Sequence, residues 1–71
     1  MTESVYKVVE LVGSSSESWE KATRAAVDLA SKSLRDLRVA EVVEQDVTIS
    51  GGKIEAYRVK LRLSFKYEAG H

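Results

Sequence analysis

The chain of 71 residues is long enough for one domain, which we expect to span residues 1–71. Its 11 basic and 11 acidic residues cancel, so no net field favours nucleic acid or an anionic membrane as a partner. Cysteine is absent, which excludes disulfides, and neither a membrane span nor a signal peptide is apparent, so we expect a cytoplasmic protein. So short a chain has a marginal core of its own, and oligomerisation is the expected source of further stability.

The first predicted element is a strand over Val5–Val12, a segment of high β propensity. Its apolar residues occupy both faces, with Val5, Val9 and Leu11 on one and Tyr6, Val8 and Val12 on the other. Both faces are therefore expected to be covered, and a neighbouring subunit is a plausible source of that cover. Gly13 is expected to end the strand.

A helix of about twenty residues is predicted next, ending near Leu37, because the segment has no Gly or Pro and is rich in Ala. Ser14 and Glu17 have the capping-box spacing, although Ser15 or Ser16 could cap the helix equally well. Residues at helical spacing form a packing stripe, which consists of Trp19, Ala22, Ala26, Leu29, Ala30, Ser33 and Leu37. The small residues in the stripe let the helix approach a sheet closely.

Two long strands follow, joined at Gly51-Gly52. The last strand alternates strictly from Tyr57 to Tyr67, with apolar residues on one face and mostly basic residues on the other. Along the preceding strand, one face is expected to carry Val39, Val43, Val47 and Ile49.

The turn sets the register between these strands. A two-residue turn would place Asp46 opposite Tyr57, on the apolar face. A three-residue turn, Gly51-Gly52-Lys53 with one Gly in the left-handed region, shifts the register by one residue. We predict this second register, because it gives the pairs Val47 with Tyr57, Val43 with Leu61, Asp46 with Arg58 and Glu44 with Lys60.

The order strand–helix–strand–strand predicts an α+β fold. Because the chain reverses at each connection, the third strand is antiparallel to both others and belongs in the middle. The result is a three-stranded antiparallel sheet wrapped on one long helix. The sheet face away from the helix is charged and must meet solvent, a ligand or another subunit; it carries Glu44, Asp46, Arg58, Lys60 and Arg62.

Several features now stand in a fixed order: the run Val5–Ser15, an Ala-rich helix, Leu37-x-x-x-Glu41-Val42, a Gly turn, and Val59-x-Leu61-x-Leu63-x-Phe65. Together they resemble the dodecin family over almost the whole chain. The resemblance implies a β-α-β-β protomer assembled into a hollow homododecamer, with a role in storing or sequestering a small ligand. Family members commonly bind flavins between aromatic side chains near symmetry axes.

Three positions depart from the flavin-binding pattern of that family. Val39 occupies the place of a Trp that stacks on the flavin ring, and a valine offers no π-face. Arg58 stands where a Gln bonds the ring edge, and Asp46 stands where an Arg is usual. The altered ligand pocket is thus expected at Val39, Asp46 and Arg58, with weak or absent flavin binding. Trp19 lies far along the chain from Val39 and is not expected to replace the missing ring. A Trp-less branch of the family, described as calcium-binding, is resembled by four runs of this chain: Ser18-Trp19-Glu20, Arg38-Val39-Ala40, Glu44-Gln45-Asp46 and Tyr57-Arg58-Val59-Lys60-Leu61.

Glu44 and Asp46 lie two apart on one strand face, where their carboxylates could share a hard cation such as calcium. The alternative is that they pair with Lys60 and Arg58 across the ladder. One protomer favours these pairs, because Ca²⁺ takes about six to eight oxygens. A symmetry axis would bring copies of the same acid together and favour a cation there.

Other chemistries are not expected. Arg58, Lys60, Arg62 and Lys66 form a basic strip, but acids neutralise part of it and no aromatic platform accompanies it, so nucleic acid is not an expected partner. His71 is the sole His, and the chain offers no thiol and no internal His base, so we expect no enzyme. A cation- or ligand-binding storage shell and a purely structural assembly remain, with flavin storage as the alternative to both.

Overall fold

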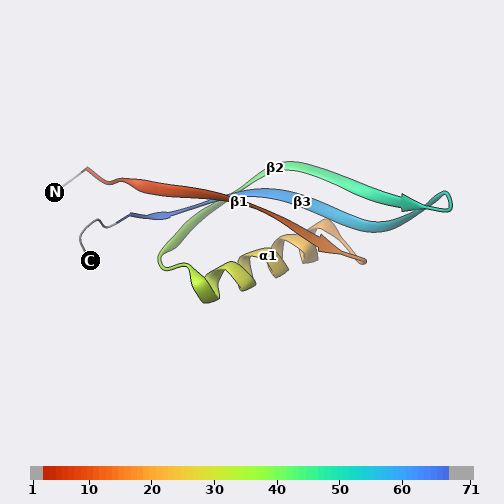
Figure 1. The fold of residues 1–71 in the computed structure, drawn as a ribbon, viewed down its shortest axis with the longest axis horizontal. Coiled ribbons are helices and arrows are strands. Elements are labelled where there is room, and N and C mark those ends of the chain that lie inside the picture. Colours follow the sequence, from red (N-terminus) through yellow and green to blue (C-terminus); the bar gives the residue numbers. More distant parts are fainter. Residues whose placement is uncertain (1–2, 68–71) are drawn as a thin grey trace.

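The structure is a computed structural model and describes residues 3–67. Its elements in chain order are β1 (Tyr6–Ser15), α1 (Trp19–Ser33), β2 (Leu37–Ser50) and β3 (Lys53–Lys66). The strands form one antiparallel sheet in the order β1-β3-β2, which confirms the predicted topology with the third strand in the middle. Figure 1 shows a long sheet with α1 beneath its middle, the start of β1 and the end of β3 toward one end, and the β2–β3 turn at the other. The predicted polar tail with His71 lies outside the described residues.

Gly13 lies inside β1, opposite Val59, so the prediction that it ends the strand is wrong. A Cβ at this position would lie 2.3 Å from the carbonyl oxygen of Ala22 and 3.1 Å from the Cβ of Ala26. Glycine is needed here because the backbone of α1 approaches the strand where a side chain would stand. The glycine therefore marks a helix–sheet contact and not a strand end.

The helix is shorter than predicted, and its cap is Ser18 rather than Ser14, Ser15 or Ser16. The Ser18 hydroxyl accepts a hydrogen bond from the backbone N–H of Lys21 at 3.0 Å, which satisfies one of the free donors of the first turn. The chain leaves the helix at Leu34, which is extended, and turns through Asp36 at a φ of 57° before β2 begins. No helix in the described part of the chain is long and apolar enough to cross a membrane.

The core is a thin layer between α1 and the middle of the sheet. It consists of Ala22, Ala26, Ala30, Val59, Leu61 and Leu63. The alanines come from the predicted stripe and the larger residues from the predicted apolar face of β3. Leu29 was also predicted on the stripe, but 68% of its surface is exposed because it points off the narrow alanine ridge. Half of the core residues are alanines, so one protomer buries little apolar surface.

The β2–β3 turn has two residues, Gly51 and Gly52, with φ values of 58° and 76°, and Ser50 pairs with Lys53. The predicted three-residue turn is therefore wrong. The predicted offset of one residue is nevertheless present, because β3 gains an extra residue opposite the step from Thr48 to Ile49. The pairs Val47–Tyr57, Asp46–Arg58 and Glu44–Lys60 are confirmed.

A second bulge lies at Val43, where β2 gains a residue. Leu61 consequently pairs with Val42, and the predicted Val43–Leu61 pair is wrong. Because the side-chain period of a strand is two, the extra residue exchanges the faces of the positions before it. Val39 is therefore paired with Ser64, on the charged side of β3, and not on the face of Val47 as predicted.

Candidate functional site

Asp46 and Arg58 form the best-ordered polar contact on the charged face. Arg58 Nε donates to Asp46 Oδ1 at 2.7 Å and Arg58 Nη2 donates to Asp46 Oδ2 at 2.8 Å, a bidentate pair. The register brings the two residues directly opposite each other on β2 and β3. The hydrogen bonds from Arg58 lower the pKa of the Asp46 carboxyl below its ordinary value, and the Asp46 carboxylate raises the pKa of Arg58. In this state both Asp46 oxygens are occupied.

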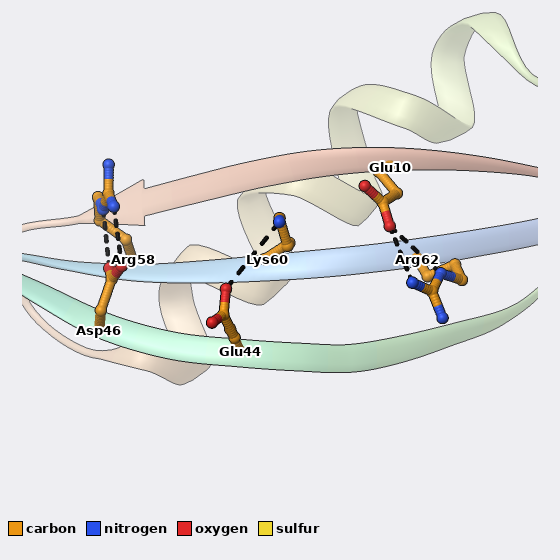
Figure 2. A network of polar contacts seen from close by, with 6 residues as sticks. All are labelled: Glu10, Glu44, Asp46, Arg58, Lys60 and Arg62. Atoms are coloured by element: carbon orange, nitrogen blue, oxygen red, sulfur yellow. Dashed lines mark hydrogen bonds and ion pairs between the residues drawn. The ribbon is translucent and has the colours of Figure 1, made fainter.

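Neighbouring pairs extend along the central strand, as Figure 2 shows. Lys60 Nζ lies 3.9 Å from Glu44 Oε1, beyond hydrogen-bond distance, and the Glu44 side chain is 70% exposed. Arg62 joins both edge strands: its Nη2 donates to Glu10 Oε2 on β1 at 3.0 Å, and its Nη1 lies 3.6 Å from Glu41 Oε1 on β2. Glu44 is thus the acid of this group that is held most loosely by its cation.

Trp19 reaches the same rung of the sheet from the opposite side. Its indole Nε1 donates to the backbone carbonyl oxygen of Asp46 at 3.0 Å. Its ring meets Tyr57 edge-on, with centroids 5.1 Å apart and an interplanar angle of 81°. Sequence reasoning placed Trp19 on the packing stripe and missed this contact, because 27 residues separate it from Asp46 and no spacing pattern connects them.

Val39 lies apart from the other two predicted pocket residues. It precedes Asp46 by seven positions on β2, which corresponds to roughly 20 Å of strand. It borders a shallow hollow of about 190 Å³ at the start of β2, lined by Val27, Leu37, Arg38, Val39, Ala40 and Leu63. Within one protomer the structure therefore brings together Asp46 and Arg58 but not Val39.

Glu44 and Asp46, the predicted metal ligands, share the charged face of β2. Among residues 3–67, no group of three or more His, Cys, Asp or Glu side chains is placed to hold a metal ion. A pair of carboxylates falls well short of the roughly six to eight oxygens of a calcium site. Within one protomer these two carboxylates therefore do not complete a calcium site.

The family model of the dodecins matches residues 5–68. The chain belongs to the dodecin family. Calcium dodecin from Mycobacterium tuberculosis is 53% identical over 64 residues, which cover 89% of this chain and 89% of that protein. The dodecin of Thermus thermophilus is 45% identical over 64 residues, which cover 90% of this chain and 93% of that protein.

Solved dodecins share the fold over nearly their whole length. The structure of the Streptomyces coelicolor dodecin has a TM-score of 0.91 at 36% identity and covers 99% of this chain and 100% of that one. The calcium dodecin of Mycobacterium tuberculosis, a calcium-chelating antigen with a novel calcium-binding site, has a TM-score of 0.81 at 48% identity and covers 96% and 97%. Dodecins assemble as dodecamers, and members of the family bind flavin.

Proposed function

We propose that this dodecin forms a homododecameric shell that binds and sequesters calcium, with weak or no binding of flavin. The observation that carries the proposal is a difference between two acids of the charged face. Asp46 forms a bidentate pair with Arg58, whereas the Glu44 side chain is 70% exposed and lies 3.9 Å from Lys60 Nζ. The 53% identity to a calcium dodecin supports the choice of cation.

Assembly follows from the apolar surface that one protomer leaves exposed. Against the six core residues, twelve large apolar side chains are exposed among the described residues: Val5, Tyr6, Val8, Val12, Trp19, Leu29, Val39, Val42, Val43, Ile49, Ile54 and Tyr67. An exposed apolar surface that outweighs the core is typical of a subunit and not of a monomer. Light scattering should give about twelve times the 7.9 kDa mass of one chain; a monomer or dimer mass would remove the basis of the shell.

Calcium suits the donors that are present, because carboxylate oxygens are hard ligands. Glu44 is the first expected ligand, since little has to be displaced for a cation to reach it. Asp46 can contribute only after its carboxylate leaves Arg58. The remaining oxygens would come from symmetry-related acids, whose mutual repulsion a cation relieves.

Flavin does not fit the residues present. Val39 has no ring to stack on an isoalloxazine, and Trp19, the sole Trp, is engaged with Tyr57 and Asp46. The Arg58 guanidinium is occupied by Asp46 instead of being free to bond a ring edge. These contacts favour cation storage over flavin storage.

The experiment is thermal unfolding of the assembly with calcium and with chelator. A cation that binds the folded shell raises the melting temperature as free calcium rises. Glu44→Gln and Asp46→Asn should reduce that rise, while Asp28→Asn, an exposed acid on α1, should keep it. Identical curves with calcium and chelator would favour the purely structural shell, and a rise that survives both substitutions would move the site to other oxygens.

A further inference from the structure

Beyond the proposed function, we infer that Trp19 is a positioning residue for the Asp46–Arg58 pair and couples the state of that pair to the N-terminus of α1. Two neighbouring rungs of the β2–β3 ladder, Asp46–Arg58 and Val47–Tyr57, are held from opposite sides of the sheet. On the charged face the bidentate pair closes the first rung. On the helix face Trp19 touches both rungs.

Trp19 contacts the residues that would have to move if the Asp46–Arg58 pair opened. Its N–H fixes the backbone carbonyl of Asp46, the residue whose carboxylate grips Arg58. Its ring packs on Tyr57, the chain neighbour of Arg58. The indole thus holds the backbone of Asp46 and the chain neighbour of Arg58, so it restrains both partners of the ion pair from the helix face.

The indole is also fixed to the start of the helix. Trp19 is the first residue of α1, directly after the N-cap Ser18, whose carbonyl accepts from the backbone N–H of Ala22 at 3.1 Å. The Trp19 carbonyl accepts from the Thr23 hydroxyl at 2.9 Å. A shift of the Asp46 backbone is therefore opposed by the first turn of the helix as well as by the strand ladder.

A role as simple packing does not account for this geometry. The Trp19 residue is 37% exposed, so it fills no closed space, and a purely apolar side chain would leave the Asp46 carbonyl without this donor. If calcium takes the Asp46 carboxylate, a step that rests on the proposed function, Arg58 is released and the Asp46 backbone loses the restraint from the charged face. The hydrogen bond from the Trp19 N–H to the Asp46 carbonyl then loosens, which carries the change to the first turn of α1.

The first test needs no calcium. As the chain has a single Trp, the assembled protein gives one indole N–H signal by NMR. Arg58→Gln opens the ion pair on the far face and should speed exchange of that N–H about two- to tenfold, the factor that corresponds to weakening one ordinary hydrogen bond. Arg62→Gln is the matched control: it lies on the same face of β3, breaks the contacts to Glu10 and Glu41, and should leave the signal unchanged. An unchanged signal in Arg58→Gln, or equal changes in both variants, would overturn the inference.

The second test runs in the opposite direction, since coupling between two sites is reciprocal. Trp19→Phe retains a ring against Tyr57 but removes the donor to Asp46, and it should speed exchange of the Arg58 Nε–H about two- to tenfold while leaving that of the Arg62 Nε–H unchanged. Unchanged exchange at Arg58 would contradict the coupling. A calcium titration of the wild type, followed by calorimetry and by Trp19 emission, separates the two proposals. If calorimetry detects no binding, the calcium function alone is refuted. If calorimetry detects binding but the emission is unchanged, the coupling is refuted.

Discussion

The carboxylate of Asp46 is gripped at both oxygens by Arg58, while two positions earlier on the same strand Glu44 stands 3.9 Å from Lys60. The two acids share a strand face and a similar cross-strand partner type, yet they differ in how firmly they are held. Arginine presents two parallel N–H groups to a carboxylate, and lysine presents a point charge on a flexible stem, which accounts for the difference.

The Asp46–Arg58 pair should make stability depend on pH in the acid range. The folded-state pKa of Asp46 lies below its ordinary value of 3.8, so the carboxylate stabilises the folded protein above that pH and the contribution disappears as pH falls through the lower, folded value. We expect the difference in melting temperature between wild type and Asp46→Asn to be small, constant above about pH 5, and absent at the acid limit. A difference that grew on acidification would contradict the sign. Asp28→Asn serves as the control acid.

Gly13→Ala should destabilise the protomer. The new methyl would lie 2.3 Å from the Ala22 carbonyl oxygen, and backbone cannot yield as a flexible side chain can. We expect a loss of about 1–3 kcal/mol in unfolding free energy, the usual cost of overpacking, seen as a lower midpoint in chemical denaturation. Ser14→Ala, at the next and exposed position, should be nearly neutral. Wild-type stability in Gly13→Ala would show that the helix–sheet spacing is adjustable.

Gly51 at the β2–β3 turn should tolerate asparagine better than valine. Its φ of +58° is left-handed, and a Cβ there would meet no atom within 4 Å, so the backbone alone decides the cost. A β-branched residue should lose about 1–2 kcal/mol, whereas asparagine visits this region readily. Denaturation midpoints of Gly51→Val and Gly51→Asn measure the difference, and equal midpoints would argue against the positive φ.

Riboflavin should bind the wild-type shell weakly, with no strong fluorescence quenching at submicromolar protein. The double variant Val39→Trp with Arg58→Gln should gain affinity, because base–aromatic stacking contributes roughly 1–3 kcal/mol per partner. Val39→Trp alone is the control for the added ring. Freeing Asp46 from Arg58 leaves a negative charge, so the gain should be smaller for a phosphorylated flavin than for neutral riboflavin. Strong quenching by the wild type would refute the assignment of Val39 and Arg58 as the altered flavin positions.

The sequence by itself determined two features of the sheet: the buried face of β3 and the pairing of Asp46 with Arg58. Strict alternation from Tyr57 onward defined which face of β3 is buried, and charge complementarity selected the register that pairs Asp46 with Arg58. Both are short-range properties: a period of two and the attraction of opposite charges on facing strands. They predicted the central ion pair, while the correct sheet order followed from the reversal of the chain at each connection.

Only the tertiary structure decided what depends on contacts between distant segments. Position 13 of β1 requires glycine because α1 passes over it, and Ser18, not an earlier serine, caps the helix. The irregularity at Thr48–Ile49 restores the predicted offset after a two-residue turn, whereas the bulge at Val43 moves Val39 away from the predicted face. The bond from Trp19 to Asp46 joins residues 27 apart, and it exists because helix and hairpin pack together, a relation that no local pattern of either segment contains.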